Sequence, residues 1–405
     1  MSNNIRKFIT TEILESLDVP ASAYEAAERR YDDLGKWLKD STKAACKIYS
    51  PHVFPQGSFR LGTVIKPWKR GEYDLDLAYK LQDGISKISH TQLELKNLVF
   101  SDLNNYRKDR RIQEALDEKR RCWRLHYQDQ LKFHMDIVPG IPEAEDSRQI
   151  LQERMISAGQ TGEFAQLVAA LAMSITDNEK PNYRVNSQDW EVSNPEGYAL
   201  WFESRMRKAQ LLLEKRAALE NVAKIDDLPA HRWKTPLQKC IQILKRHRDV
   251  MFEADPKEKP ISVIITTLAA KSYQGETDLE SAITRIISRM GGHINSIEPR
   301  VPNPVNPKED FADKWKDNPR LEQNFQKWLR SVQAHFEYLA QIDAPDRLSE
   351  NILQNFGVRI DSLKLKKHFG LIEKATAITA GTAFTDKDGV IGNTGVENKP
   401  HQFYG

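Results

Sequence analysis

The segment of residues 54–81, FPQGSFRLGTVIKPWKRGEYDLDLAYKL, constrains the fold of this chain more than any other. The Gly57-Ser58 pair lies in a turn-prone part of it, and Asp74-Leu75-Asp76 follows inside an apolar run. The run alternates with a period of two, which predicts a half-buried strand. Successive side chains of a strand point to opposite faces, so Asp74 and Asp76 share one face while the leucines between and after them enter the core.

A second strand is predicted at residues 131–138, LKFHMDIV, where Asp136 shares a face with His134. Residues 122–127 are its expected hairpin partner, with a turn at residues 129–130. Adjacent strands lie about 4.8 Å apart, so Asp136 can stand beside the first carboxylate pair.

Three carboxylates this close repel one another unless a cation binds between them. Oxygen ligands with open positions for phosphate favour Mg²⁺ or Mn²⁺, and two such ions can clamp the attacking and leaving oxygens of an in-line displacement. Each Asp alone also fits a solvated strand position, and only the combined pattern favours a metal site. Gly57 would let the backbone approach a phosphate closely, and Ser58 would offer N–H and O–H donors.

The rest of the chain shows mostly helical periodicity. A helix is expected at residues 5–17, one long helix at 23–49, and a polar helix within 89–119. After Pro142 the helical pattern returns at residues 145–156, 194–219, 235–252, 261–272, 279–290, 321–340 and 347–356. A Pro/Asn-rich loop is expected at 300–307, and a flexible tail at 381–405, which holds five of the 19 glycines.

Composition excludes several classes of protein. The 405 residues are 40% hydrophobic and 29% charged, as in ordinary globular proteins, and the net charge of +3 gives no global field for nucleic acid. No apolar run approaches the roughly 20 residues of a membrane span, and the N-terminus lacks a signal-peptide core. The three cysteines form no CxxC motif, so we expect neither a disulfide framework nor a structural zinc site. We expect the protein to be located in the reducing cytoplasm.

Several motifs together resemble a known family. PQGSFRLGT, YDLDLAY and HMDIVPG have the pattern of the polymerase-β-like nucleotidyltransferases. NPEGYALWFESR, LKRHRD followed by PISVIITTLAA, and NPVNPKEDFADKW resemble more closely the bacterial CD-NTases, the cGAS/DncV-like nucleotidyltransferases of CBASS anti-phage defence. The resemblance covers roughly residues 20–358.

The resemblance implies an α+β fold with two lobes and an active site between them. A nucleotidyltransferase core with a mixed sheet and N-terminal helices would occupy residues 1–165. A helical C-terminal domain would follow at 166–358, and residues 359–405 would form a C-terminal segment ending in a flexible tail.

The resemblance also implies site residues. Gly57 and Ser58 match the phosphate-binding pair. Asp74, Asp76 and Asp136 match the catalytic metal ligands, and Asp136 would also activate the acceptor hydroxyl.

Two residues of the helical lobe match the positions that hold the donor triphosphate. Lys245 is one, although it also fits a helix pair with Asp249 at i to i+4 spacing. Ser262 is the other, although it also fits an N-cap of the helix at 261–272.

Two features depart from the family pattern. The gap between the Gly-Ser pair and the first Asp is long and basic, which fits either an exposed turn or a basic flap over the phosphates. The zinc-binding His/Cys insertion of the animal DNA sensor is absent, which puts activation by double-stranded DNA through that route in doubt. The basic cluster at residues 107–124 alternates with acids and is expected to be a solvated helix face.

The implied function is synthesis of a cyclic di- or trinucleotide second messenger from ATP and/or GTP, with release of pyrophosphate. A linear 2-5A-like or RNA-tailing nucleotidyltransferase and a catalytically silent nucleotide-binding module remain alternatives. In some CD-NTases the terminal residue of a mobile tail is attached to targets by proteins resembling ubiquitin-activating and ubiquitin-conjugating enzymes. Gly405 is the candidate conjugation site here, and a plain disordered end is the alternative.

Overall fold

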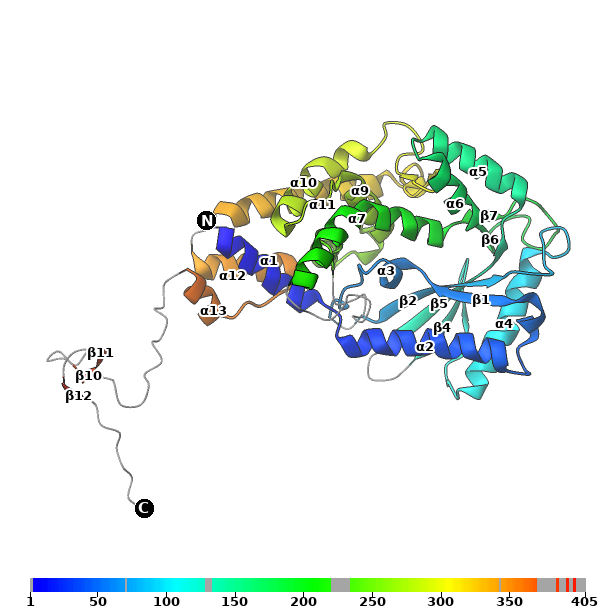
Figure 1. Cartoon of the computed structure of the whole chain (residues 1–405), viewed down its shortest axis with the longest axis horizontal. Helices are drawn as coiled ribbons and strands as arrows, with labels where there is room; N and C mark the ends of the chain where they lie inside the picture. Colours follow the sequence, from blue (N-terminus) through cyan, green and yellow to red (C-terminus); the bar gives the residue numbers. More distant parts are fainter. Residues whose placement is uncertain are drawn as a thin grey trace, which may run out of the picture.

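The structure is a computed structural model that describes residues 3–69, 71–127, 133–219, 234–341, 344–369 and three two-residue strands between 384 and 397. A lobe built on one sheet and a lobe of helices lie side by side (Figure 1). None of the described helices is long and apolar enough to cross a membrane.

The sheet contains the strands that the sequence predicts. Its main path has the order β1 (Pro51–Pro55), β2 (Tyr73–Leu81), β5 (Phe133–Pro142), β4 (Trp123–Tyr127) and β3 (Asp117–Glu118). Strands β2 and β5 are parallel, and the other pairs are antiparallel. The predicted pairing of β4 with β5 is confirmed, while the predicted turn at 129–130 lies outside the described residues.

The register of β2 and β5 sets the functional face of the sheet. Asp76 is opposite Asp136, and Asp74 is opposite His134. The residues between them, Leu75 and Met135, are buried in the core on the other face. The predicted division of acids and apolar residues between the two faces is therefore confirmed.

Two helices cover the apolar face of the sheet, α2 (Ala21–Asp40) and α4 (Gln92–Asp109) (Figure 1). The single helix expected at 23–49 is wrong, because α2 ends at Asp40 and a separate 3₁₀ turn follows at Ala45–Tyr49. The cause is tertiary: the carboxylate of Asp102 on α4 accepts hydrogen bonds from the backbone N–H groups of Ala45 and Cys46.

The basic cluster at 107–124 is not one helix face. Helix α4 ends at Asp109, and Arg111 has a positive φ of 53°, which an α-helix cannot accommodate. The chain then returns to the sheet through β3 and β4. Arg124, which the sequence pattern put on a solvated surface, lies on β4.

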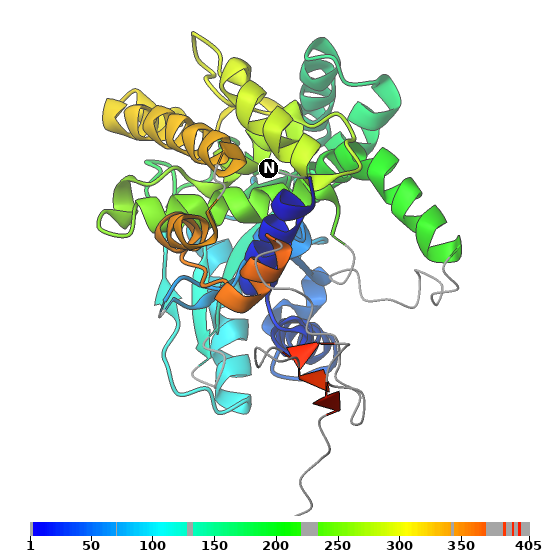
Figure 2. The ribbon, with the colours of Figure 1, turned by 90° about the vertical axis from the view of Figure 1, so that its left-hand side faces the viewer.

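The helical lobe confirms the predicted helices to within a few residues. Its described helices are α5 (Glu145–Ser157), α6 (Gly162–Ala170), α7 (Pro195–Leu219), α8 (Pro236–Met251), α9 (Ser262–Ser272), α10 (Leu279–Arg289), α11 (Pro319–Gln341) and α12 (Pro345–Phe356). Helix α1 (Asn3–Leu17) packs with α12 and α13 (Ser362–His368) in a separate apolar cluster (Figure 2). Helices α6 and α13 were not predicted.

Strands β1 and β3 were not predicted from the sequence, and three further regions contain unpredicted strands. Strands β6 (Met173–Ile175) and β7 (Glu191–Ser193) extend the main sheet from β5, beyond the proposed domain boundary at residue 165. The expected loop at 300–307 is instead largely a hairpin of β8 (Pro302–Asn303) and β9 (Asn306–Asp310). In the segment expected to be irregular, β10 (Phe384–Thr385), β11 (Ile391–Gly392) and β12 (Val396–Glu397) form a small sheet.

Candidate active site

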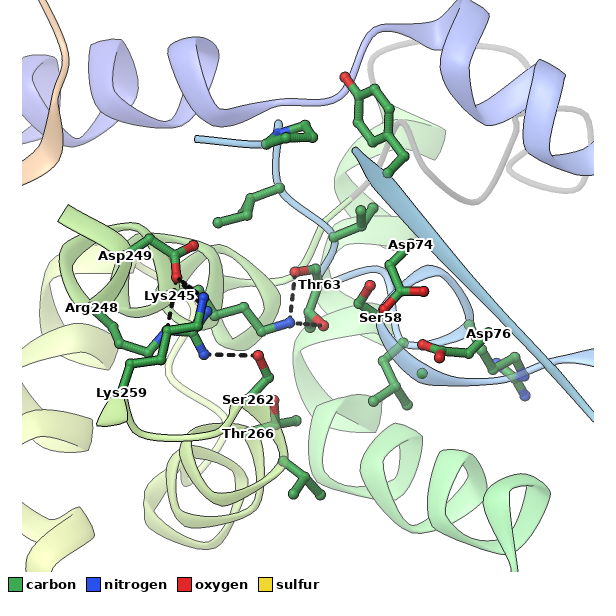
Figure 3. A pocket seen from close by; sticks show the side chains of 18 of the residues that line it. Ser58, Thr63, Asp74, Asp76, Lys245, Arg248, Asp249, Lys259, Ser262 and Thr266 are labelled. Carbon is green, nitrogen blue, oxygen red and sulfur yellow. Dashed lines mark hydrogen bonds and ion pairs between the residues drawn. The ribbon is translucent and has the colours of Figure 1, made fainter. Parts of the chain in front are cut away.

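A cavity of about 730 Å³ lies between the two lobes. The sheet lobe contributes Gly57, Ser58, Asp74 and Asp76, and the helical lobe contributes Lys245, Arg248, Lys259 and Ser262 (Figure 3). Six of the seven residues assigned by resemblance to the metal and phosphate sites therefore line one cavity. The seventh, Asp136, is not among the lining residues that the structure describes, and lies beside the cavity on β5.

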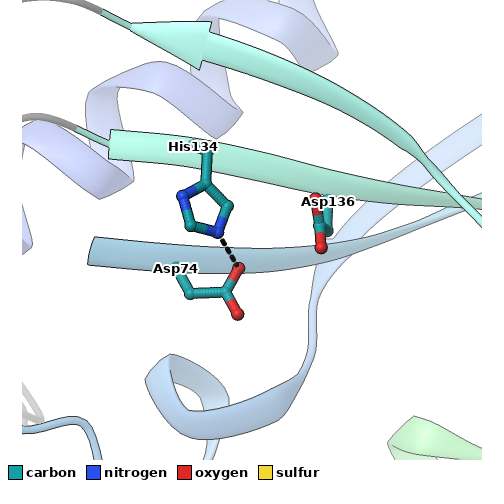
Figure 4. Close-up of side chains that lie close together, drawn as sticks. All are labelled: Asp74, His134 and Asp136. Atoms are coloured by element: carbon teal, nitrogen blue, oxygen red, sulfur yellow. Dashed lines mark ion pairs between the residues drawn. The ribbon is translucent and has the colours of Figure 1, made fainter. Parts of the chain in front are cut away.

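Two of the three predicted carboxylates, Asp74 and Asp136, come together with His134 on the polar face of β2 and β5, and Asp76 is not in this group. One ligand atom each of Asp74, His134 and Asp136 lies within 4.8 Å of the others (Figure 4). His134 Nε2 is 3.1 Å from Asp74 Oδ1, and its Nδ1 is 3.3 Å from Glu72 Oε2. The hydrogen bond to Asp74 raises the pKa of His134 above its ordinary value.

Asp76 is partly buried, and its carboxylate lies against Gly57. Burial, followed by the nearby charges of Asp74 and Asp136, holds its pKa well above the ordinary range of a carboxyl group. The protonated form of Asp76 is therefore favoured by burial and by the two neighbouring acids.

Gly57 has a packing role that the sequence did not suggest, and its contact with phosphate stays a prediction. It adopts a φ of +63°, and a Cβ placed on it would overlap the Asp76 carboxylate. Only glycine satisfies both conditions at low cost, so Gly57 fixes the distance between the turn and the buried acid.

Arg124 is a site residue that sequence reasoning missed. Its Nε and one terminal nitrogen donate to the two oxygens of Asp136 at 2.6 and 2.7 Å. Arg124 and Asp136 are opposite each other on the antiparallel strands β4 and β5. The predicted hairpin was a partial signal: it pairs residues 122–127 with 131–138, but a two-residue turn at 129–130 would put Arg124 opposite Met135, one residue from its observed partner.

Lys245 contacts the Gly-Ser turn segment from the helical lobe. Its Nζ lies 3.1 Å from both the carbonyl oxygen and the hydroxyl oxygen of Thr63. Asp249 instead pairs with Arg248 and Lys259, so the alternative of a Lys245–Asp249 helix pair is wrong. Burial and then the charge of Arg248 lower the pKa of Lys245 to about 7.

One stripe of α8 donates to consecutive parts of the turn segment. Besides Lys245, its donors are Gln238 to the carbonyl of Leu61 at 3.0 Å, Gln242 to that of Val64 at 2.6 Å, and Arg246 to that of Lys66 at 2.6 Å. These helix positions lie on one face at helical spacing. Segment 61–66 is therefore attached to the helical lobe through main-chain acceptors.

Ser262 is the first residue of α9, and the N-cap position belongs to Ile261, so the N-cap alternative is wrong. The hydroxyl oxygen of Ser262 accepts a hydrogen bond of 2.8 Å from Arg248. Arg248 and Lys259, which the sequence did not single out, add two cationic groups beside Ser262 (Figure 3).

The described residues of the basic stretch, 66–69 and 71, are docked on the helical lobe. Trp68 packs against Gly357 so closely that a Cβ on Gly357 would overlap the indole ring. The guanidinium carbon of Arg246 lies 5.0 Å from the centroid of the same ring. Lys69 forms an ion pair with Glu253. Because Pro67, Trp68 and Gly71 line the cavity, the stretch is a wall of the cavity rather than a free turn.

The unpredicted hairpin supplies a further part of the cavity wall. Asn303, Glu309 and Phe311 line it, and the ring of Phe311 packs edge-on against Tyr198 of α7. The Glu309 carboxylate accepts a hydrogen bond of 2.7 Å from Asn303, and burial raises its pKa. The turn-forming Pro304 between two asparagines was the available signal for this hairpin.

The donor set fits a hard divalent cation. Carboxylate oxygens suit Mg²⁺ and Mn²⁺, and ligand atoms of Asp74, His134 and Asp136 lie close enough to share one ion. The predicted conjugation site, Gly405, lies outside the described residues.

Comparisons with known proteins show which family and which relatives this chain is similar to. Residues 51–139 match the family described as cyclic GMP-AMP synthase DncV-like, nucleotidyltransferase domain. A c-di-GMP synthase of Roseivirga ehrenbergii is 26% identical over 363 residues, which is 89% of this chain and 82% of the relative. The cyclic dinucleotide synthase CdnG of Bradyrhizobium diazoefficiens is 21% identical over 384 residues, 88% of this chain and 82% of CdnG.

A solved structure extends the similarity to the fold. The Bradyrhizobium diazoefficiens CD-NTase CdnG, solved in complex with GTP, superposes with a TM-score of 0.62 at 17% identity, covering 90% of this chain and 97% of CdnG. Residues 51–139 are therefore a DncV-like nucleotidyltransferase domain, and the whole chain is a nucleotidyltransferase with the CD-NTase fold.

Proposed function

We propose that this enzyme joins nucleoside triphosphates into a cyclic oligonucleotide with release of pyrophosphate, as a cytoplasmic component of anti-phage defence. One observation carries the proposal: a group of carboxylates and a group of cationic and hydroxyl side chains line the same cavity between the lobes. The relatives named as cyclic dinucleotide synthases support a cyclic product.

In this proposal the donor triphosphate lies along the cationic side of the cavity. Lys245, Arg248 and Lys259 offer charge-assisted donors, and the hydroxyls of Ser58 and Ser262 offer neutral ones. The docked stretch at 66–71 closes one side of the cavity and reduces the access of water to the phosphates.

The carboxylates act at the other side. The hydroxyl oxygen of a second nucleotide forms a bond to the α-phosphorus of the donor while the bond from that phosphorus to the bridging oxygen breaks. Pyrophosphate leaves, and we assign the hydroxyl proton to Asp136. The linear product then rebinds with its own triphosphate on the cationic side and closes by the same chemistry.

We assign the binding of two Mg²⁺ or Mn²⁺ ions to Asp74, Asp76 and Asp136. When bound, such ions supply positive charge at the attacking and leaving oxygens. The remaining contribution of the chain is positioning, because phosphoryl transfer needs little covalent chemistry from the protein.

ATP and/or GTP are the proposed substrates. The name c-di-GMP synthase and the GTP complex of CdnG support a guanine nucleotide among them. The division at residues 165 and 358, and the attachment of Gly405 by a ubiquitin-conjugating-like system, are further parts of the proposal that rest on the resemblance alone.

The test is incubation of the purified protein with radiolabelled NTP mixtures and Mg²⁺ or Mn²⁺, with and without an extract of phage-infected cells. We expect a phosphatase-resistant product from wild type and none from the double variant Asp74→Ala, Asp76→Ala. Asp32→Asn is the matched control, because Asp32 is exposed on α2.

Two outcomes contradict the proposal. A phosphatase-sensitive ladder of products would identify a linear nucleotidyltransferase. NTP binding without any product in all mixtures, unchanged in the double variant, would identify a silent binding module.

A further inference from the structure

The inference concerns Arg124 and the third carboxylate of the site. Arg124 donates to both oxygens of Asp136 in the bidentate geometry that is the strongest form of such a pair. The pair is largely shielded from solvent, since the side chains of Arg124 and Asp136 are 26% and 15% exposed. Neighbouring strands hold the two residues opposite each other, so the contact does not depend on a loop.

Among the described residues, Asp136 is the carboxylate to which Arg124 has its hydrogen bonds and ion pair. Asp136 differs in this respect from the other two acids. Asp74 is contacted by the imidazole of His134, and the carboxylate of Asp76 abuts Gly57. A full, permanent positive charge therefore lies against one acid of the group, because a guanidinium does not deprotonate in proteins.

A divalent cation bound by Asp136 must share that carboxylate with Arg124. The two positive charges would lie within a few ångströms of each other and repel, and the cation would also have to draw on oxygens that already accept hydrogen bonds. Arg124 in turn reduces the repulsion between Asp136 and the two acids on β2, and fixes the direction of the Asp136 oxygens.

We propose that Arg124 is the positioning residue of the metal centre, which holds Asp136 in place and in doing so weakens the binding of the divalent cation. The inference rests on the proposed assignment of Asp136 as a metal ligand. It predicts that bound metal exchanges readily, because Arg124 competes with the cation for Asp136 and so keeps the metal affinity low.

The experiment measures Mn²⁺ affinity directly, by electron paramagnetic resonance of free Mn²⁺ and by calorimetry, without nucleotide. We expect Arg124→Gln to bind Mn²⁺ about tenfold more tightly than wild type, because one positive charge is removed beside the ligand. Arg124→Lys keeps the charge but loses the bidentate contact, so its affinity should lie between the two.

Arg121→Gln is the matched control. Arg121 lies three residues earlier and pairs with Asp177, so its removal should leave the Mn²⁺ affinity unchanged. Circular dichroism and thermal unfolding establish that each variant is folded. If Arg124→Gln does not fold, the comparison of Arg124→Lys with wild type decides the question.

Three results would overturn the inference: unchanged Mn²⁺ affinity in Arg124→Gln, weaker affinity in that variant, or an equal gain in Arg121→Gln. Weaker binding would mean that Arg124 only orders the ligand, and an equal gain would mean a general charge effect. The variant Asp136→Asn distinguishes a failure of the Arg124 inference from a failure of the proposed function. If this variant binds Mn²⁺ as tightly as wild type, Asp136 is not a metal ligand and the proposed assignment is wrong.

Discussion

Gly57 is packed so closely against the carboxylate of Asp76 that a methyl group on Gly57 would overlap it. The contact joins the Gly-Ser turn to one of the acids of the site. We therefore expect Gly57→Ala to abolish product formation and to destabilise the fold by about 1–3 kcal/mol, through the overlap and the positive φ.

Urea unfolding and the radiolabelled assay measure both effects of Gly57→Ala. Gly35→Ala is the control, because Gly35 lies inside α2 with nothing within 4 Å of its would-be Cβ. That substitution should stabilise by about 0.5–1 kcal/mol. Full activity in Gly57→Ala would contradict the interpretation.

Asp76→Asn should stabilise the metal-free protein while removing its activity. The pKa of Asp76 is raised in the folded state, so its stabilising contribution is complete below the unfolded value of about 4 and is lost as pH rises through the folded pKa. The advantage of the variant over wild type should therefore be larger at pH 8 than at pH 5.

Unfolding curves in EDTA at both pH values measure this difference for Asp76→Asn. Saturating Mn²⁺ should narrow it, because the metal stabilises the ionised wild type. A variant that is less stable than wild type at pH 8 without metal would show that the Asp76 charge is already neutralised.

Lys245 makes nucleotide affinity depend on pH. Its pKa is about 7 because of burial and the charge of Arg248, and a bound triphosphate favours the protonated form. Affinity for NTP should fall as pH rises above 7. Lys245→Met should bind about 10- to 100-fold more weakly at pH 6, as expected for a lost charge-assisted hydrogen bond, and should lack this pH dependence.

Calorimetric titration with a non-hydrolysable NTP between pH 6 and pH 9 provides the measurement for Lys245→Met. Lys327→Met is the control, because Lys327 is exposed on α11. An equal slope with pH in wild type and Lys245→Met would remove Lys245 from the triphosphate site.

Trp68 and Gly357 should show energetic coupling between the cavity wall and α12. Gly357 ends α12 with a φ of +65° and lies under the indole of Trp68. Gly357→Ala should cost about 1–3 kcal/mol in the wild type and less in a Trp68→Ala background, where the overlap is gone.

A double-mutant cycle by urea unfolding gives the coupling energy of this pair. We expect more than about 0.5 kcal/mol, the range found for residues in contact. Additive effects would mean that the stretch at 66–71 is not held by this contact.

The alternation of acids and leucines made the functional face predictable. Leu75 and Met135 had to be buried, so the positions of Asp74, Asp76 and Asp136 followed from the period of the two strands. Lys245 and Ser262 came from resemblance to a family, because no local pattern relates α8 and α9 to the Gly-Ser turn.

What the sequence could not provide were contacts made by tertiary structure. The end of α2 at Asp40 depends on Asp102, which is about sixty residues away in the chain. Arg124 looked like a member of an ordinary charged run, and only the strand register brings it to Asp136. Glu309 lies at the cavity because β8 and β9 form a hairpin, whereas the prolines and asparagines of this segment predicted a loop.

The stripe of donors on α8 has a consequence for how such an enzyme can change over time. Its acceptors in segment 61–66 are all carbonyl groups, except for the additional hydroxyl of Thr63. Carbonyl groups are the same in every amino acid, so most side chains of this segment can be replaced without releasing the junction between the lobes. The side chains of α8 must therefore be kept to preserve that junction. The side chains of the cavity wall can change, and with them the nucleotides that the cavity prefers.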